Sequence, residues 1–163
     1  MTNDRGPDGA THGEEELTMA TPFQVTFDSA EPAQLGAFWA ELLGYVEQPP
    51  PPGFDSWDAA LAALGVPASE RDGAYGIVDP DGAGPRLFFQ RVPEGKTAKN
   101  RVHLDVGVSG GFEVPPEQRR LAVEEAAERA VDLGATRVGA HEGLGGQFHV
   151  TCLDLEGNEF CLQ

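Results

Sequence analysis

The chain is poor in positive charge. Its 163 residues include 11 Lys and Arg against 27 Asp and Glu, which gives a formal net charge of −16. The few basic residues are scattered along the sequence and form no cluster. Because nucleic acids and anionic membrane surfaces bind proteins through clustered positive charge, we expect neither as a partner.

The sequence also lacks a hydrophobic run of the roughly 18–20 residues that a membrane span needs. Residues 1–20 show no basic segment followed by an apolar one, so we expect an acidic, disordered tail there and a cytoplasmic protein. Cysteine is scarce as well. Cys152 and Cys161 flank one predicted turn, and we expect free thiols in preference to a disulfide.

What the sequence does contain is an order of predicted elements that occurs twice. Alternating apolar residues predict strands, and apolar residues at helical spacing between Pro and Gly predict helices. The first set is a strand at 22–29, a helix at 31–45, a short helix at 56–65 and strands at 74–78 and 86–92. The second set is a strand at 100–108, a helix at 115–134 and strands at 135–140, 146–154 and 158–163.

Each set ends in the same sequence pattern, an acidic turn that leads into an apolar strand. The two copies read VDPDGAGPRLFFQ and DLEGNEFCLQ, and both contain the pattern D-x-[DE]-G. The sequence therefore predicts an internal repeat of about 70–75 residues within one domain at 21–163. We place module one at about 22–95 and module two at about 98–163.

The segments FQVTFDSAEPAQLGAFWAELLGY, PRLFFQRVPEGKTAKNRVHLDV and DLEGNEFCLQ resemble the vicinal oxygen chelate superfamily, in particular its small glyoxalase-like branch. This superfamily includes glyoxalase I, extradiol dioxygenases, fosfomycin-resistance enzymes and bleomycin-binding proteins, and the similarity covers roughly residues 22–163. The resemblance implies an α+β fold in which two βαβββ modules form a concave mixed sheet with a central cleft.

The resemblance also implies where a metal site would lie. Metal-using members place ligands on the first and last strand of each module, and these positions fall here on Gln24 and Gln90 in module one and on His103 and Cys161 in module two. Glyoxalase I has a glutamate at both last-strand positions. Two carboxylates balance the charge of a divalent ion and one also serves as a base, whereas a glutamine amide cannot take up a proton.

The cofactor therefore stays open, and the sequence favours metal-independent chemistry or plain binding over a bound divalent metal and over glyoxalase I activity. His103 is a metal ligand, a general acid or base, or a hydrogen-bonded strand residue without a catalytic role. Cys161 is a thiolate ligand or a small buried hydrophobe. Gln24 and Gln90 are substrate-orienting or ordinary cleft-lining amides.

Aromatic residues give a further candidate for ligand binding. Trp57 and Phe54 follow the proline run QPPPPGF, which predicts a stiff connector. If the connector folds over the cleft, these rings form a lid, and a loop that they stabilise without a ligand is the alternative. His149 faces either the pocket or the outer surface of its sheet. Asp105, near His103, is a weaker candidate.

Two functions follow from these observations. One is an enzyme of the lyase or isomerase type that acts on a small oxygenated molecule, with His103 as its central residue. The other is a non-catalytic protein that sequesters a small, antibiotic-type molecule in the same cleft. Both modules lie in one chain, so either function fits a monomer or a homodimer.

Overall fold

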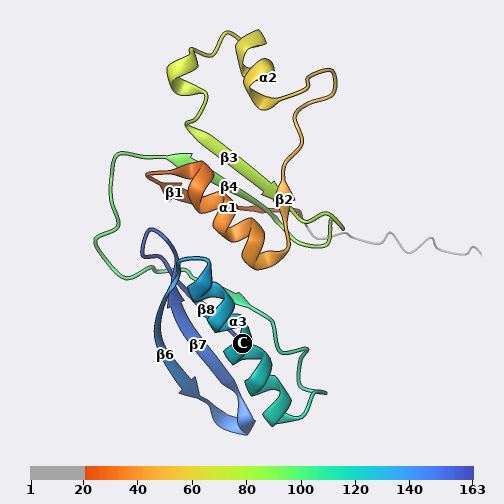
Figure 1. The fold of residues 1–163 in the computed structure, drawn as a ribbon, viewed down its shortest axis with the longest axis vertical. Helices are drawn as coiled ribbons and strands as arrows, with labels where there is room; N and C mark the ends of the chain where they lie inside the picture. Colours follow the sequence, from red (N-terminus) through yellow and green to blue (C-terminus); the bar gives the residue numbers. More distant parts are fainter. Residues whose placement is uncertain (1–20) are drawn as a thin grey trace, which may run out of the picture.

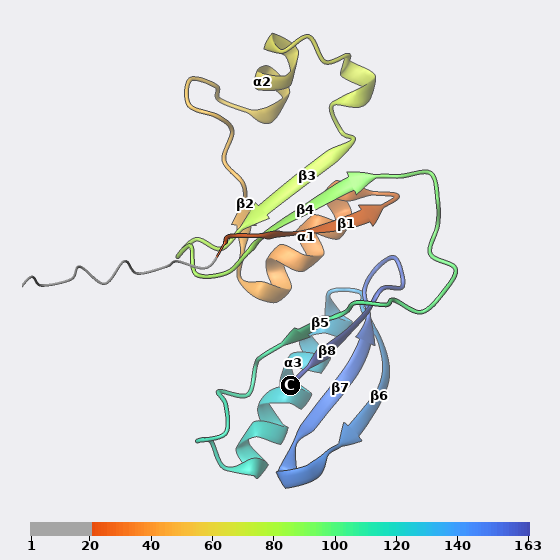
Figure 2. The same cartoon turned by 180° about the vertical axis from the view of Figure 1, so that it is seen from behind.

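The computed structural model describes residues 21–163 (Figures 1 and 2). The predicted acidic tail at 1–20 lies outside the described residues. Strand, helix and three further strands occur twice along the chain, which confirms the two βαβββ modules. Module one comprises β1 (Gln24–Ser29), α1 (Pro32–Leu43), β2 (Val46–Glu47), α2 (Trp57–Ala63), β3 (Ala74–Val78) and β4 (Arg86–Arg91). Module two comprises β5 (Leu104–Val106), α3 (Pro116–Asp132), β6 (Thr136–Glu142), β7 (Phe148–Leu153) and β8 (Glu159–Leu162).

Each module folds into a mixed sheet of four strands with the same topology. The strand orders are β1-β4-β3-β2 and β5-β8-β7-β6, so the first strand of each module lies parallel to the last. Figure 2 shows α1 between the sheet of module one and module two, and α3 against the sheet of module two. Each sheet therefore has one face covered by its helix and one face turned away from it, which we call the open face.

Strand alternation decides which side chains reach the open face. In β1, Val25 and Phe27 pack into the core beneath α1, while Gln24, Thr26 and Asp28 alternate with them. Module two follows the same rule, because Phe160 and Leu162 of β8 are fully buried and Cys161 between them is only partly buried. Candidate functional residues therefore belong to the open faces.

Aromatic packing joins the two modules. Trp39 of α1 is 1% exposed, and its ring lies 5.4 Å from that of Phe27 in module one and 5.0 Å from that of Phe160 in module two. Its indole N–H donates to the buried carboxylate of Asp154 at 3.2 Å. The single core thus spans both sheets, which fixes their relative position.

The start of α1 is stabilised from the other module. Its N-cap, Glu31, makes no hydrogen bond with its own side chain. Instead, the carboxylate of Glu156 accepts the backbone N–H groups of Ala30 and Glu31 and the hydroxyl of Ser29. Burial raises the pKa of Glu156, but these hydrogen bonds outweigh burial and hold the pKa below its ordinary value.

The two acidic turns have the same internal structure, which explains the repeated sequence pattern. The Asp79 carboxylate accepts the backbone N–H groups of Asp81, Ala83 and Gly84, and that of Asp154 accepts those of Glu156 and Asn158. The glycine of each pattern has a positive φ, 70° at residue 82 and 83° at residue 157, as such turns require.

One predicted strand is shorter than expected, while the short second helix begins where the sequence predicts. The strand expected at 100–108 is reduced to Leu104–Val106, because β5 pairs with β8 over three residues only and Val102 is 80% exposed. The short second helix begins as expected, with the Ser56 hydroxyl accepting the N–H of Ala59. Within residues 21–163, no helix is long and apolar enough to cross a membrane.

Candidate functional site

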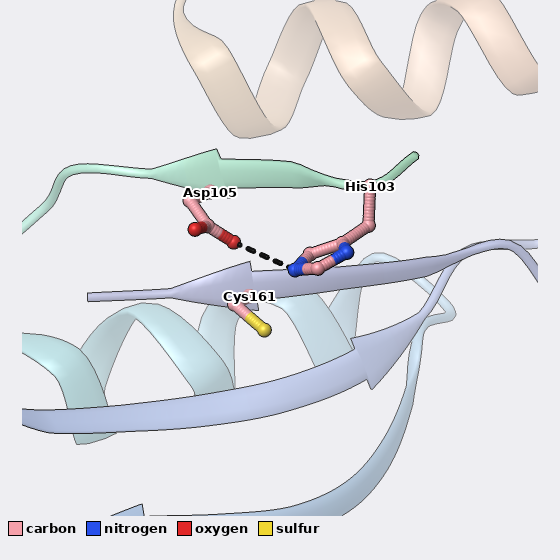
Figure 3. A group of neighbouring side chains, drawn as sticks. All are labelled: His103, Asp105 and Cys161. Atoms are coloured by element: carbon pink, nitrogen blue, oxygen red, sulfur yellow. Dashed lines mark ion pairs between the residues drawn. The ribbon is translucent and has the colours of Figure 1, made fainter. Parts of the chain in front are cut away.

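Three chemically distinct side chains meet on the open face of module two (Figure 3). His103 Nε2 lies 3.2 Å from Asp105 Oδ1, and the Cys161 thiol completes a group whose ligand atoms all lie within 4.8 Å of one another. Figure 3 shows His103 and Asp105 on the same side of the β5 segment and Cys161 on the neighbouring strand β8. We call these three residues the HDC cluster.

The sheet brings the HDC cluster together by two simple rules. His103 and Asp105 are two residues apart, so they point to the same face of an extended segment. Asp105 is directly opposite Cys161 in the parallel pairing of β5 with β8. On the other side of β8, Thr151 is opposite Cys161, and its hydroxyl lies 3.6 Å from the sulfur. The cluster is therefore held on the β5 segment and β8, and Thr151 of β7 borders it.

The Asp105 carboxylate lies beside one ring nitrogen of His103. Its Oδ1 is 3.2 Å from Nε2, and in the neutral tautomer that carries its proton on Nε2 the lone pair is on Nδ1. The two side chains are 42% and 47% exposed, so a small molecule can reach them from solvent. This arrangement gives a base with an orienting carboxylate.

The second cysteine has a different environment. Cys152 lies on β7 opposite Phe160 and is fully buried in the core, and burial raises the pKa of its thiol. Cys161 faces the opposite side of the sheet, so the two thiols cannot form a disulfide without a change of register. Both cysteines are free, as the sequence predicts.

The donor set of the HDC cluster fits a metal ion of the zinc type. Bonds of roughly 2.0 Å in a tetrahedral site separate two light donor atoms by roughly 3.3 Å, and the His103–Asp105 distance of 3.2 Å matches this. Imidazole, carboxylate and thiolate are all zinc ligands, and three protein ligands leave one position open. The carboxylate missing from the sequence-based ligand set is thus present on Asp105.

At the edge of the HDC cluster, Glu159 has a structural role. It accepts the backbone N–H of Asn100 and forms an ion pair of 3.1 Å with Lys96. The Asn100 N–H contributes most to keeping the pKa of Glu159 at about 2, and Lys96 adds to the effect. A permanently charged, fully engaged carboxylate is not available as a base, so Glu159 anchors the 96–100 segment to β8.

One member of the cluster, His103, lines a cavity between the first strands of the two modules. This cavity, of about 210 Å³, is lined by Thr26 and Asp28 from β1 and by His103 and Glu159 from module two. Its position between β1 and β5 matches the predicted central cleft. His149, another predicted ligand-binding residue, does not line this cavity. It lies on β7, where its ring stacks on that of His141 with 5.0 Å between the ring centroids.

The structure does not bring the four predicted metal positions together. Gln24 is opposite Arg86 and Gln90 is opposite Asp28 in the β1–β4 pairing, so the two amides lie four residues apart, about 13 Å along the strand. Gln24 accepts a hydrogen bond from Arg86, and Gln90 donates one to Asp28. They cannot both contact one ion, and they do not join the HDC cluster.

The correct module-one counterparts follow from the register. Gln90 pairs with Asp28 as Cys161 pairs with Asp105, so the position equivalent to His103 is Thr26 and not Gln24. The signal for Asp105 was present in the sequence as its i+2 spacing from His103.

Module one has a larger pocket of a different kind. A cavity of about 600 Å³ lies between α2 and the strands β3 and β4. Its lining includes Trp57, Tyr75, Phe88 and Arg86. The Trp57 indole donates to the backbone oxygen of Gln48 at 2.7 Å, which fixes the ring at the pocket wall. Phe54, the other predicted lid residue, is 38% exposed and does not line this cavity.

A glycine keeps this pocket compatible with the arginine. A Cβ at position 76 would lie 2.8 Å from Gln48 Oε1 and 3.0 Å from Arg86 Nη2. Arg86 in turn donates to Gln48 and lies 4.6 Å over the ring of Phe88. Because Gly76 has no side chain, the Arg86 guanidinium can lie over β3, where it donates to the Gln48 side chain. On its other side it donates to the Gln24 side chain.

Comparison with known proteins agrees with this fold. A family model described as a glyoxalase-like domain matches residues 24–163. A glyoxalase/bleomycin resistance protein/dioxygenase family enzyme from Burkholderia phytofirmans superposes with a TM-score of 0.56 at 16% identity, covering 85% of this chain and 94% of that one. A possible glyoxalase from Bacillus cereus gives 0.56 at 11% identity, with coverage of 89% and 99%.

A variant of the fosfomycin resistance protein FosX from Listeria monocytogenes, solved with Mn(II) and a dihydroxypropylphosphonic acid, also has a TM-score of 0.56. It shares 14% identity, and the alignment covers 89% of this chain and 90% of that one. No curated protein matches the chain in sequence. With its two βαβββ modules and the family match over residues 24–163, the chain belongs to the glyoxalase-like domain family.

Proposed function

We propose that this protein binds a small oxygenated organic molecule at the open face of module two and acts on it as a lyase- or isomerase-type enzyme. The observation that carries the proposal is the HDC cluster, in which a histidine and an orienting carboxylate of the β5 segment and a thiol of β8 lie together. The FosX neighbour, whose structure holds a small oxygenated phosphonic acid, supports a ligand of this class.

In this proposal His103 moves a proton. Its Nδ1 lone pair accepts the proton of a C–H bond next to a carbonyl, and the electron pair of that bond passes to the carbonyl oxygen. The imidazolium, stabilised by Asp105, then returns the proton to a neighbouring atom of the same molecule. The product is an isomer, or, when a β-substituent takes the electron pair instead, a leaving group and a double bond.

A zinc-type ion is the alternative use of the same residues: if bound, it would be held by His103, Asp105 and Cys161 and would polarise the carbonyl oxygen as a Lewis acid, and His103 would then be a ligand and not the base. Elemental analysis of the purified full chain tests this part separately. One equivalent of zinc, lost in Asp105→Asn and Cys161→Ser, supports a metal-dependent enzyme. Metal-free protein that keeps its activity assigns the chemistry to His103 and Asp105 alone.

The activity is tested by following proton exchange. The full chain is incubated in D₂O with hydroxyacetone, glycolaldehyde or pyruvate, and proton NMR records deuterium uptake next to the carbonyl. We expect exchange that falls roughly a hundredfold in His103→Asn, because general acid–base catalysis contributes at least that factor. His141→Asn, an exposed histidine of the same module, is the control. Equal rates in all three proteins would refute the proposal.

The pocket of module one favours a second candidate, the non-catalytic sequestration of a small, antibiotic-type molecule. Three aromatic rings around 600 Å³ suit an aromatic ligand, and Arg86 supplies a polar contact. Binding that quenches Trp57 fluorescence without chemical change would support sequestration. For either candidate we place the protein in the cytoplasm as a monomer or homodimer, without nucleic acid or membrane as a partner.

A further inference from the structure

A separate cavity lies at the carboxyl end of β5, beyond the HDC cluster. It encloses about 430 Å³ between the loop that follows β5, the first turn of α3 and the start of β7. Its lining contains three glycines of the loop, together with Phe112, Arg119, Phe148, His149 and Gln163. None of these residues belongs to the HDC cluster or lines the pocket of module one.

Arg119 is the unusual member of this lining. It is 9% exposed, and its Nε has no hydrogen-bond partner among residues 21–163. No carboxylate of the described residues lies within ion-pair distance of it, including the terminal carboxylate of Gln163, which lines the same cavity. Five of the nine other Lys and Arg residues at 21–163 do have carboxylate partners: Arg71, Arg91, Lys96, Arg120 and Arg137.

A buried guanidinium without an anion is costly, and an acid-rich chain offers many possible partners. The contact of Arg119 with the Phe112 ring, at 5.2 Å, compensates for only part of this cost. Phe112 is itself 74% exposed, so one side of the guanidinium is covered by a ring at the surface of the cavity. Arg119 also lines the cavity, where its unpaired Nε–H is available to a ligand.

Neutral donors surround the arginine. Arg119 lies in the first turn of the seventeen-residue helix α3, whose N-cap is Pro115 and whose first N–H groups have no side-chain cap. The backbone N–H groups of Gly110 and Gly111 form no hydrogen bond with another group of residues 21–163. The positive end of the helix dipole and free N–H groups therefore favour an anion at this point.

We propose that this cavity binds a small oxyanion, a carboxylate or a phosphoryl group, with Arg119 as its charged donor and the N–H groups of Gly110 and Gly111 as neutral donors. Both kinds of group present oxygen acceptors that match the planar fork of an arginine. The backbone oxygen of Gln163, another lining residue, accepts the N–H groups of Val108 and Ser109.

The oxyanion cavity adjoins the HDC cluster on the same sheet. Gln163 and His149, which line the cavity, are each two residues from Cys161 and Thr151, about 7 Å along their strands. His103 itself is four residues, about 13 Å, from Gly107 of the cavity, and Arg119 belongs to the helix on the covered face, so the two sites are distinct. The oxyanion cavity is therefore a site of its own and does not depend on the proposed function.

The test uses the full chain labelled with ¹⁵N. Inorganic phosphate and acetate are titrated separately at constant ionic strength, and NMR follows the backbone amides and the Arg119 Nε–H. We expect saturable shifts at Gly110, Gly111 and Arg119, and the tighter of the two ions identifies a phosphoryl or a carboxylate ligand. Shifts spread over the exposed lysines and arginines, with none at these three groups, would overturn the proposal.

Two variants sharpen the result. Arg119→Gln is expected to weaken binding of the tighter ion at least about tenfold, as for the loss of a charge-assisted hydrogen bond. Arg120→Gln, the next residue of α3, is the matched control because Arg120 is exposed and paired with Glu142. Equal affinity in both variants contradicts the proposal, and the wild-type shift map decides if Arg119→Gln does not fold.

A third variant separates the two proposals. His103→Asn removes the proposed base and leaves the oxyanion cavity intact, so the phosphate or acetate shifts at Gly110 and Gly111 persist in it. Loss of exchange activity with intact anion binding supports both proposals. Intact anion binding in a wild-type protein without exchange activity supports the cavity and refutes the proposed function alone.

Discussion

In module one, the last strand presents Gln90 opposite Asp28 of the first strand, and in module two it presents Cys161 opposite Asp105. The backbone arrangement is the same, including the parallel pairing and the acidic turn before the last strand. The Gln90 amide donates a hydrogen bond of 2.8 Å to the Asp28 carboxylate. Thr26 occupies the position in module one that is equivalent to His103 in module two. The shared scaffold thus carries an aspartate in both modules, but a histidine and a thiol in module two only.

The modules also differ in what surrounds their open faces. Module one has the additional helix α2 and a broad, aromatic pocket, whereas module two has short connections, the HDC cluster and the oxyanion cavity. Binding area and reactive groups are therefore concentrated in different halves of the molecule. The common core, with Trp39 between them, makes the two halves one cooperative unit.

The largest expected effect comes from that common core. Trp39→Ala removes a fully buried ring that contacts both sheets, and we expect a loss of about 3–5 kcal/mol in the free energy of unfolding. Trp57→Ala, in the pocket of module one, is the matched control and is expected to cost less. Urea unfolding measures both. Equal losses would show that the modules do not depend on a shared core.

A second comparison concerns the two acidic turns. Asp154 is 4% exposed and accepts hydrogen bonds from its own turn and from the Trp39 indole, so Asp154→Ala should cost about 2–3 kcal/mol. Asp79 serves its turn alone, and Asp79→Ala should cost less. Thermal unfolding of the two variants measures this difference. A larger effect at Asp79 would contradict the assignment of Asp154 to the interface between modules.

The smallest of the three effects depends on pH. Because the folded-state pKa of Glu156 lies below its ordinary value of 4.5, its stabilisation is complete above that pH and is lost as the pH falls through the folded value. We expect Glu156→Gln to cost about 1 kcal/mol near neutral pH, since the carboxylate is partly exposed. The difference from the wild type should shrink in acid. A deficit independent of pH would show that charge is not involved.

Much of the fold could be predicted because local patterns specify it. The D-x-[DE]-G turns need an aspartate acceptor and a glycine at positive φ, and both are visible in the sequence. Strand parity also placed His103 on one face of β5. The shorter extent of β5 could not be predicted, because Val102 fits an alternating pattern while its exposure depends on where β8 begins.

The site was less predictable, for a reason of register. Gln24 and Thr26 both face the open side of β1, and only the pairing with β4 shows which of them matches His103. Likewise, the proximity of Asp105 to Cys161 depends on the β5–β8 register. Arg119 gave no signal at all in sequence, because an arginine in an amphipathic helix normally finds solvent or a carboxylate.

The central claim is that ligands act at the HDC cluster of module two and not at the aromatic pocket of module one. Cys161 reports on the first and Trp57 on the second, while Cys152 is buried. In one experiment, fluorotryptophan-labelled protein is exposed to glycolate, pyruvate, phosphoglycolate or propylene glycol, and both the alkylation of Cys161 by iodoacetamide and the Trp57 fluorine resonance are followed. The resonance is assigned with Trp57→Phe.

We predict that at least one of these compounds slows the alkylation of Cys161 and leaves the Trp57 resonance in place. Compounds that shift the Trp57 resonance without protecting Cys161, or no protection by any of them, would contradict the account.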